Sequence, residues 1–504
     1  MTDIGHSIRR GVALGPRRIA LIDGDVELDW GTLADRVGRC AGALRAAGWT
    51  DGTRIAILSE NSHRYIELIF GAASAGAITV PLNFRLAETE LASILADAEP
   101  AAIFASPAFL DVAVRLGAAR GIAVRSLAPG QDGYEAMIAA HPPWTTLPRG
   151  GDDVAVLYYT SGTSGSPKGV MLTHDNLFTA ALSAMNTLRV TPDSVSMIPS
   201  PFFHVAALAL LLPTMMAGAR AIIVPRFTIE DALDTLRRHR PTIAVLVNTI
   251  LEFLLNDPAA DAIDLSRLEA VMFGASALRP ALRDQMVRTL AGKRLLHGYG
   301  MTEATTIVSM MDFATVPAGD PRQEPSSIGR AVAGVEVSIA GAQQPGEIGE
   351  ILVRGPTVMK GYWRKPDETR AALADGWLHT GDLGYLDDGG HLFIVDRLKD
   401  MIITGGENVY SVEVERVVDE HPAVEKCVVI GGPDPKWGET VVAVIRLRPG
   451  AAIEADAIIA HCRDRIAGYK VPRRIILRTE EFPVNAAGKL VKTALRSEYF
   501  AAAT

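Results

Sequence analysis

Apolar positions in the first part of the chain follow two alternating patterns. Between residues 30 and 47 they recur every three to four positions, as in an amphipathic helix, and Gly48 ends the pattern. The run 54–58 is almost continuously apolar and indicates a strand, and the same pair of patterns returns as a helix at 65–75 and a strand at 77–81. Strands that alternate with helices predict parallel sheets covered by helices, and therefore an α/β fold.

The pattern continues and then changes character in the second half of the chain. A strand at 221–225, a helix at 229–239 and a strand at 242–247 repeat the alternation. From 328 to 394, short apolar runs are separated by glycine, proline and an Asp-Asp-Gly-Gly turn, which predicts an antiparallel, barrel-like subdomain. Helix and strand patterns resume after residue 400, and the remaining chain is long enough for a compact α+β unit.

Composition narrows the class of protein. At 504 residues the chain is too long for one ordinary core and suggests at least two domains. A hydrophobic content of 48% with 21% charged residues excludes a disordered chain. The net charge of −8 argues against binding nucleic acid, which needs a basic surface.

The three cysteines, Cys40, Cys427 and Cys462, have neither the spacing of a metal site nor that of a disulfide framework. We expect them to be reduced and buried, which fits a cytoplasmic protein. The N-terminus lacks the apolar segment of a signal peptide. The longest apolar stretch, 205–219, contains Pro213 and is shorter than the ~20 residues of a membrane span, so it predicts a buried helix. A peripheral membrane contact is compatible with a lipid substrate, and the sequence leaves monomer and homodimer open.

One loop carries the strongest chemical signal. Residues 159–169 hold five serine and threonine side chains, three glycines and one lysine, directly after the apolar run 154–158. Glycines allow a close backbone approach, successive N–H groups can surround an anion, and Lys168 supplies a point charge for phosphate. The loop therefore predicts a polyphosphate site and favours ATP as its ligand. It is not a Walker A loop, because Lys168 is followed by Gly169 and an apolar run, which places the loop between two strands. A plain Ser/Gly hairpin turn is the simpler alternative.

This loop resembles the signature of the adenylate-forming superfamily, which includes acyl- and aryl-CoA synthetases, luciferases and the adenylation domains of peptide synthetases. Further motifs of that family follow in the family's order. They are Phe202-Phe203-His204-Val205, Gly274-Ala275-Ser276, Gly298-Tyr299-Gly300-Met301-Thr302-Glu303, the run 349–356, Trp377-Leu378-His379-Thr380-Gly381-Asp382, Asp396-Arg397-Leu398-Lys399-Asp400, Gly405-Gly406-Glu407-Asn408 and the run 483–489.

The resemblance implies a domain plan and a reaction. It implies a large N-terminal domain over 1–396, a hinge at 397–399 with Lys399 at the hinge position, and a small mobile C-terminal domain over 400–504. The reaction has two halves. A carboxylic acid first attacks the α-phosphorus of ATP to give acyl-AMP and pyrophosphate, and coenzyme A then takes the acyl group and releases AMP. Such chemistry asks the protein mainly for positioning and charge neutralisation.

The resemblance also assigns the nucleotide site. The phosphates are assigned to Thr160, Ser161, Gly162, Thr163, Ser164 and Lys168. Glu303 would bind Mg²⁺ and Thr302 the α-phosphate, Tyr299 would stack on adenine, and Gly300 would lie beside the nucleotide. Gly274, Ala275 and Ser276 would pass beside the adenine and the acyl group. Asp382 would accept hydrogen bonds from the ribose hydroxyls, and Arg397 would assist there. The simpler alternatives are a solvated carboxylate at a helix start for Glu303 and a core aromatic for Tyr299.

Three residues are assigned to catalysis: Lys489, Thr302 and His204. Lys489 would bridge the substrate carboxylate and the α-phosphate, and Gly488 before it supports a flexible loop; the alternative is an ordinary surface lysine. His204 would gate the acyl pocket, and the alternative is a core histidine. The coenzyme A site is assigned to Gly405, Gly406, Trp437, Tyr469 and Arg473.

The acyl pocket is expected to be apolar and small-sided. Its assigned residues are His204, Val205, Ala206, Asn248, Phe273, Gly298, Met301 and Ile307. They include no aspartate for an amino group and no cation for a second carboxylate, which favours a fatty or an aromatic acid. Three other functions stay open: loading of a carrier protein in trans, a luciferase-like oxygenase, and a protein that binds ATP without catalysis.

Overall fold

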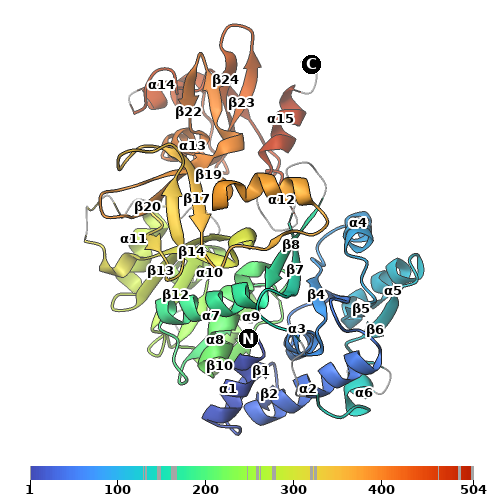
Figure 1. The fold of residues 1–504 in the computed structure, drawn as a ribbon. Helices are drawn as coiled ribbons and strands as arrows, with labels where there is room; N and C mark the ends of the chain where they lie inside the picture. Colours follow the sequence, from blue (N-terminus) through green and yellow to red (C-terminus); the bar gives the residue numbers. More distant parts are fainter. Residues whose placement is uncertain are drawn as a thin grey trace. The chain divides into compact units, whose positions relative to one another are not determined.

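The computed structural model describes residues 2–128, 130, 133–144, 149–160, 167–226, 228–246, 248–256, 260, 263–274, 280–317, 320, 322, 326–463, 465–485 and 490–500. The chain forms two compact units (Figure 1). Unit 1 comprises residues 1–337, 352–379 and 390–392, and unit 2 comprises residues 338–351, 380–389 and 393–504.

A seven-stranded sheet organises the first part of unit 1. Its order is β18-β8-β7-β4-β3-β5-β6, and the strands are β3 (Arg54–Leu58), β4 (Ile78–Pro81), β5 (Ala102–Ala105), β6 (Ala123–Ser126), β7 (Val154–Thr160), β8 (Lys168–Thr173) and β18 (Gly361–Tyr362). Strands β3 to β7 pair in parallel, whereas β8 pairs antiparallel with both β7 and β18. The sheet thus changes direction at the β7–β8 hairpin.

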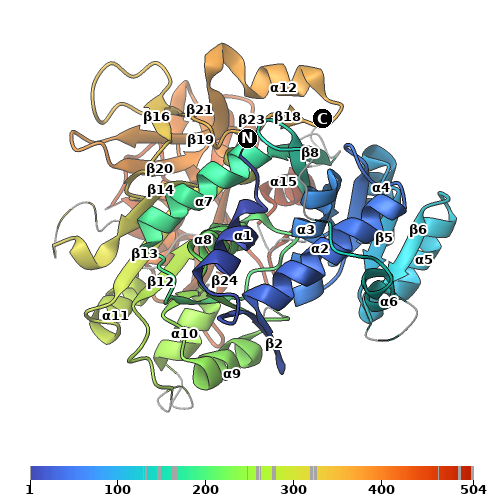
Figure 2. The same cartoon turned by 60° about the horizontal axis from the view of Figure 1, so that its bottom comes forward.

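Helices cover this sheet because their apolar faces meet its buried strands. They are α2 (Trp30–Ala46), α3 (His63–Ala75), α4 (Glu88–Ala98), α5 (Leu110–Ala118) and α6 (Tyr134–Ala139). Helix α3 begins where the Ser62 hydroxyl accepts a hydrogen bond from the backbone N–H of Tyr65, and it ends at Gly76, whose φ is 88°. Helices α2 and α3 lie together in both views (Figures 1 and 2). A methyl group on Gly71 would come 2.6 Å from Cys40 Sγ, so the two helices need a glycine at this contact.

A nine-stranded sheet forms the rest of unit 1, in the order β15-β14-β13-β12-β11-β9-β10-β1-β2. Its strands are β1 (Ile19–Asp23), β2 (Val26–Asp29), β9 (Val195–Ile198), β10 (Arg220–Ile223), β11 (Ile243–Val245), β12 (Ala270–Gly274), β13 (Arg294–Met301), β14 (Thr306–Asp312) and β15 (Arg330–Ala331). The accompanying helices are α1 (His6–Leu14), α7 (His174–Leu188), α8 (Leu208–Ala217), α9 (Ile229–His239), α10 (Asn248–Asn256) and α11 (Pro280–Thr289). The six strands from β13 to β1 along this order pair in parallel, so their carboxyl ends share one edge.

Unit 2 contains one whole sheet and most residues of another. The latter is a four-stranded sheet of β16 (Glu336–Ile339), β17 (Gly349–Arg354), β19 (Leu378–Leu386) and β20 (Leu392–Arg397). The other sheet has the order β22-β21-β24-β23, and β25 also pairs with β24; these strands are β21 (Ile402–Thr404), β22 (Glu407–Val409), β23 (Val424–Asp434), β24 (Gly438–Leu447) and β25 (Arg474–Leu477). Helices α13 (Ser411–Asp419), α14 (Ala455–Arg463) and α15 (Lys492–Phe500) complete the unit, which has its own hydrophobic core.

The α/β fold with a large N-terminal and a small C-terminal part is confirmed. The strand at 54–58 and the helix at 229–239 have the expected bounds. The apolar stretch 205–219 becomes the short 3₁₀ helix Val205–Ala207 followed by the wholly buried α8, as expected for a buried segment. All three cysteines are buried and free. Within the described ranges, no helix is both long enough and apolar enough to cross a membrane.

The stretch 328–394 does not stay together. Strand β15 extends the nine-stranded sheet, β18 extends the seven-stranded sheet, and the rest forms the four-stranded sheet. Helix α12 (Pro366–Ala372) follows β18. The reason is that β18 has a neighbour with an unpaired edge, the β7–β8 hairpin, and adding a strand satisfies the backbone groups of that edge.

Candidate functional site

The Ser/Gly-rich loop lies between two strands, as its sequence predicted. Strands β7 and β8 form an antiparallel hairpin in which Thr160 stands opposite Lys168. The predicted phosphate-binding residues Ser161, Gly162, Thr163 and Ser164 lie outside the described residues. The two described members of the set, Thr160 and Lys168, therefore mark the two sides of the hairpin mouth.

A tyrosine connects this hairpin to Glu303. The Lys168 ammonium lies 5.0 Å from the centre of the Tyr362 ring, within the range of a cation–π contact. The Tyr362 hydroxyl donates a hydrogen bond of 3.0 Å to Oε1 of Glu303. Burial raises the pKa of the Tyr362 phenol, and the negative charge of Glu303 and the hydrogen bond to it raise it further, so the hydroxyl keeps its proton and remains a donor.

Glu303 is held on a tightly constrained backbone. It lies in the 3₁₀ helix Thr302–Ala304 between β13 and β14, and only 9% of its surface is exposed, which contradicts the alternative of a solvated carboxylate. Thr305 and Thr306 follow with φ of 50° and 88°, a region that β-branched residues rarely adopt. The Thr305 hydroxyl donates to the backbone oxygen of Thr357 at 2.7 Å, and the backbone N–H of Met359 donates to the backbone oxygen of Glu303 at 2.8 Å.

The residues present fit a Mg²⁺ ion that arrives with a nucleotide. Glu303 offers a carboxylate, the hard oxygen ligand that Mg²⁺ prefers. Across the described part of the chain, no three His, Cys, Asp or Glu side chains gather into a metal site. An ion held here would therefore take its other ligands from phosphate and water, as Mg²⁺ commonly does.

The carboxyl ends of β12 and β13 carry glycines that allow neighbouring backbone segments to pack closely. Gly274 pairs with Gly298, and a Cβ on Gly274 would come 2.6 Å from the backbone oxygen of Gly298. A Cβ on Gly300 would come 1.5 Å from the backbone oxygen of Thr306, so only glycine fits. Tyr299 between them is half-buried. Ala275 and Ser276, predicted to continue this surface, lie outside the described residues.

The expected acyl-pocket residues are placed less uniformly. Val205 and Ile307 are buried, and His204 caps the 3₁₀ helix, with its Nδ1 accepting a hydrogen bond of 3.1 Å from the N–H of Ala206. Met301 is half-buried at the end of β13, and Gly298 lies earlier in the same strand. Asn248 begins α10, and its side chain is not among those described.

Phe273 occupies a core position. Its ring stacks on His297 at 5.2 Å and on Phe313 at 6.0 Å, and 3% of its surface is exposed. That Phe273 lines the acyl pocket stays a prediction. Burial also lowers the pKa of His297 to about 4, so that imidazole is neutral, and its Nδ1 lies 3.3 Å from the backbone oxygen of Ser327.

In unit 2 the two predicted ribose-binding residues lie together. Arg397 Nε is 3.5 Å from Asp382 Oδ1, and Asp382 is 15% exposed while Arg397 is 50% exposed. Arg397 ends β20, and Lys399, the predicted hinge residue, lies in the 3₁₀ helix Leu398–Asp400 that follows. The two opposite charges are therefore close enough to attract each other.

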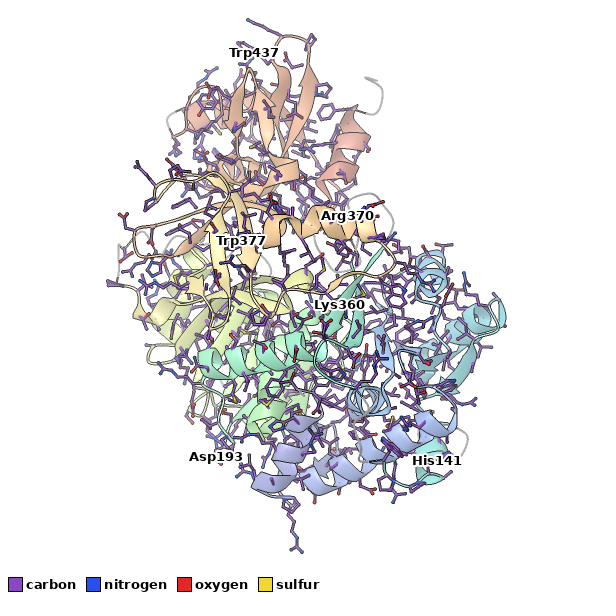
Figure 3. The ribbon with its side chains drawn as sticks, viewed as in Figure 1. His141, Asp193, Lys360, Arg370, Trp377 and Trp437 are labelled. Carbon is purple, nitrogen blue, oxygen red and sulfur yellow. The ribbon has the colours of Figure 1, made fainter. Side chains whose placement is uncertain are left out.

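Four of the five predicted coenzyme A residues, Gly405, Gly406, Trp437 and Arg473, lie together in unit 2. Gly405 and Gly406 make the β21–β22 turn with φ of 61° and 87°. The Gly405 N–H donates to the backbone oxygen of Trp437 at 2.8 Å, and a Cβ on Gly405 would come 2.6 Å from the Trp437 ring. The Arg473 guanidinium lies 4.6 Å above the centre of the same ring. Figure 3 labels Trp437 at the end of β23 and β24.

Tyr469 and Lys489 are the remaining predicted site residues of unit 2. Tyr469 is 38% exposed, and the Lys470 ammonium lies 5.7 Å from its ring centre. Lys489 lies outside the described residues. The chain on either side of it is joined, because Val484 pairs with Leu490 and the N–H of Val491 donates to the backbone oxygen of Pro483 at 2.9 Å.

Sequence reasoning missed a buried polar network just beyond Lys489. The Lys492 ammonium donates to the Ser411 hydroxyl at 2.6 Å and lies 2.7 Å from Glu415. The Ser411 hydroxyl in turn donates to Asp396 at 2.7 Å. Burial raises the pKa of Glu415, opposed by the charge of Lys492. No local pattern marks this network, because its members come from β20, α13 and α15.

Tyr362 was also missed. Tyr362 lies outside the recognised motifs, and a tyrosine between Gly361 and Trp363 has no chemical signature of its own. The one local signal is the short segment between Gly361 and Pro366, where α12 begins. A glycine followed by a few residues before a helix is compatible with a short edge strand.

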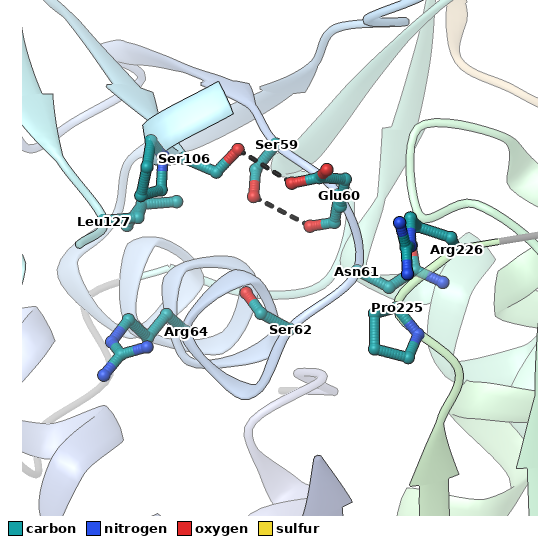
Figure 4. A pocket seen from close by; sticks show the side chains of 10 residues that line it. Ser59, Glu60, Asn61, Ser62, Arg64, Ser106, Leu127, Pro225 and Arg226 are labelled. Carbon is teal, nitrogen blue, oxygen red and sulfur yellow. Dashed lines mark hydrogen bonds between the residues drawn. The ribbon is translucent and has the colours of Figure 1, made fainter. Parts of the chain in front are cut away.

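A cavity of about 300 Å³ in unit 1 lies beyond the carboxyl ends of β3 and β5 (Figure 4). Its polar side chains bond to one another or to the backbone: Ser106 donates to Glu60 at 3.0 Å, and Asn61 donates to the backbone oxygen of Ser200 at 2.9 Å. None of the predicted site residues lines it. This cavity therefore does not coincide with the candidate site.

Comparison with known families and proteins identifies clear relatives. The model of the family described as AMP-binding enzyme matches residues 8–363, and that of the AMP-binding enzyme C-terminal domain matches residues 413–489. A feruloyl-CoA synthase from Amycolatopsis sp is 38% identical over 496 residues, covering 97% of this chain and 98% of that protein. The long-chain-fatty-acid–CoA ligase FadD13 from Mycobacterium tuberculosis is 34% identical over 511 residues, covering 99% of each chain.

A solved structure matches almost the whole chain as well. The crystal structure of ATP-bound MatB from Rhodopseudomonas palustris superposes with a TM-score of 0.89 at 31% sequence identity, covering 99% of each chain. The likeness in sequence and in fold thus extends over both units.

Proposed function

The chain belongs to the family of AMP-binding enzymes, and on this premise we propose that it activates a hydrophobic carboxylic acid at the hairpin mouth and the Glu303 segment. It is an AMP-forming acid–CoA ligase, which makes an acyl-AMP and then an acyl-CoA thioester. ATP and coenzyme A are its co-substrates. The single observation that carries the assignment of the site is the approach of Lys168 and Glu303 to the same tyrosine.

We propose that in the first half-reaction the unit 1 residues hold the triphosphate. Lys168 and Thr160 stand at the two sides of the hairpin mouth, where a cation and a hydroxyl suit phosphate oxygens. Glu303 holds Mg²⁺, which when bound neutralises phosphate charge. Thr302, half-buried beside Glu303, donates to the α-phosphate, and Tyr299 faces the adenine.

Unit 2 supplies the remaining roles in this proposal. Asp382, oriented by Arg397, accepts from the ribose hydroxyls. Lys489 neutralises the charge that develops between carboxylate and α-phosphate. Residues 397–399 act as the hinge between the two half-reactions, and the Gly405 turn with Trp437, Tyr469 and Arg473 receives coenzyme A.

The substrate is proposed to be a hydrophobic acid, either a fatty acid or an aromatic acid. The described candidates Val205, Ile307 and Met301 are apolar, and burial of an apolar group at such a surface gives about 25 cal/mol per Å². The relatives named above are a feruloyl-CoA synthase and a long-chain-fatty-acid–CoA ligase, which represent both alternatives. A cytoplasmic location remains a prediction.

The test is pyrophosphate release with ATP and Mg²⁺ across acetate, octanoate, palmitate, benzoate and ferulate, with and without coenzyme A. The proposal expects a signal that needs a hydrophobic acid, a thioester product only with coenzyme A, and loss of the signal in K489A. Turnover that ignores coenzyme A would point to a carrier protein or an oxygenase instead. ATP binding without pyrophosphate release for any acid would contradict the assigned site.

A further inference from the structure

We propose that Tyr362 is a positioning residue for the first half-reaction: its hydroxyl orients the Glu303 carboxylate and its ring supports the Lys168 ammonium, so that a divalent cation and a triphosphate find both charges in place. This proposal rests on the proposed function. None of the sequence motifs assigns a role to Tyr362, and the inference comes from the contacts of its side chain.

The hydroxyl acts on the carboxylate. The hydrogen bond of 3.0 Å from Tyr362 reaches Oε1 of a glutamate that is 9% exposed, where a charge-assisted bond is strong and has little competition from water. A donor on one oxygen fixes the rotation of the carboxylate plane. Groups that orient a metal ligand in this way typically contribute about 10- to 100-fold to metal affinity.

The ring acts on the lysine. An ammonium 5.0 Å from the ring centre is attracted to the face of the ring, and this attraction limits where the flexible lysine side chain goes. Lys168 and Glu303 carry opposite charges, and a direct ion pair between them would leave neither available to a ligand. Tyr362 instead contacts both groups, the ammonium through its ring and the carboxylate through its hydroxyl.

The backbone around Tyr362 is built to hold this position. Strand β18 pairs with β8, which places Tyr362 opposite Val170, two residues from Lys168. The N–H of Tyr362 donates to the Thr369 hydroxyl at 2.9 Å. Gly361 has a φ of 146°, and a Cβ there would come 2.6 Å from Thr369, so the turn before the tyrosine requires glycine.

The same hairpin contains a matched control. Tyr159 is also a phenol on this sheet, and it donates to Asp97 at 2.6 Å. Tyr159 directly precedes Thr160, the first residue assigned to phosphate, and its own hydroxyl bonds Asp97, which has no assigned role. Y159F and Y362F each remove one hydroxyl that is bonded to a carboxylate, and only Y362F removes it from Glu303.

The experiment measures ATP binding by isothermal titration calorimetry in the absence of any acid, at a series of Mg²⁺ concentrations. We expect Y362F to raise the Mg²⁺ concentration needed for half-maximal ATP affinity about tenfold, as loss of an orienting partner predicts. We expect Y159F to match wild type. Y362L, which also removes the ring, should lower ATP affinity further at saturating Mg²⁺.

A double-mutant cycle identifies the route of the effect. If Tyr362 acts through Glu303, then adding Y362F to E303Q changes the Mg²⁺ dependence by less than twofold, because the carboxylate is already gone. Additive effects of Y362F and E303Q would overturn the proposal. So would equal behaviour of Y362F and Y159F, or a thermal midpoint of Y362F well below that of Y159F, which would assign Tyr362 a structural role.

Failure of this inference differs from failure of the proposed function. If wild type binds no ATP at any Mg²⁺ concentration, the proposed function fails. If wild type binds ATP in a Mg²⁺-dependent way and Y362F does the same with unchanged constants, only the role of Tyr362 fails.

Discussion

The hairpin mouth of unit 1 and the Gly405 turn of unit 2 both place a cation on an aromatic ring, but the rings differ in their other partners. Each joins an aromatic ring and a cation: Lys168 lies 5.0 Å from the Tyr362 ring centre, and Arg473 lies 4.6 Å from that of Trp437. In unit 1 the ring also bonds a carboxylate, Glu303. In unit 2 a second cation, Lys436, lies 4.6 Å from the Trp437 ring.

This difference indicates two modes of anion binding, one with a divalent cation and one without. The unit 1 cluster contains a hard oxygen ligand and suits phosphates that carry a divalent cation. The unit 2 cluster contains two cations around one ring and suits an anionic group without a metal, with the ring available for stacking. The comparison predicts that variants of the two clusters impair different halves of the reaction.

The largest effect is expected from E303Q. Loss of the carboxylate charge should lower acid-dependent pyrophosphate release about 100-fold or more, the size seen when one preorganised electrostatic group is removed. The measurement is pyrophosphate release at saturating ATP over a range of Mg²⁺ concentrations. Conversion of supplied acyl-AMP to acyl-CoA should stay within about twofold of wild type. An equal loss in both assays would contradict the prediction that the two clusters serve different half-reactions.

A large effect on stability is expected from K492M in unit 2. It would leave Glu415 and Ser411 without the ammonium that joins them, and we expect the unfolding free energy to fall by about 3 kcal/mol. R465A is the control, because it breaks the exposed pair Arg465–Glu420 in the same unit and should cost under about 1 kcal/mol. Chemical denaturation measures both, and K492M/E415M should regain part of the loss.

An intermediate effect is expected from G405A. Its Cβ would press on the Trp437 ring at a position with a φ of 61°, so we expect the KM for coenzyme A to rise about tenfold, equivalent to about 1.4 kcal/mol. G406A is the matched control, since that glycine has a φ of 87° but open space around its Cβ. If both variants raise the KM equally, backbone strain and not the contact with Trp437 is responsible.

The smallest effect concerns pH. The pKa of His297 is about 4 in the folded protein, against an ordinary 6.5, so the unfolded chain takes up this proton first as the pH falls. The unfolding free energy should therefore be highest above about pH 7 and should lose about 1 kcal/mol by pH 5.5 from this group. Denaturation of wild type and H297F measures it, and an unchanged pH dependence in H297F would contradict the assignment.

Local patterns predicted the elements well where side-chain periodicity decides the structure. Helix α9, strand β3 and the hairpin around the Ser/Gly loop formed as expected, because their burial and turn signals lie within a few residues. The pairing of β18 with β8 could not be predicted this way. It joins residues almost two hundred positions apart and is decided by the free edge of β8.

The candidate site shows the same limit. Motifs located Lys168, Glu303, Asp382 and Trp437, because each carries its chemistry in a recognisable run of residues. The sequence did not predict Tyr362 or the Lys492 network. Their roles depend on contacts between residues that are far apart in the chain. Phe273 was predicted to line the acyl pocket, and the alternation of the strand places its ring against His297 and Phe313, a contact that no local pattern predicts.

One measurement tests most directly whether the two clusters serve different half-reactions. It is rapid-quench, single-turnover quantification of acyl-AMP and acyl-CoA for wild type, E303Q and W437A, with an acid that wild type accepts. We predict that W437A forms acyl-AMP at the wild-type rate and accumulates it in the presence of coenzyme A, while E303Q forms little of either product. Normal acyl-AMP formation by E303Q, or equal loss of acyl-AMP in both variants, would contradict it.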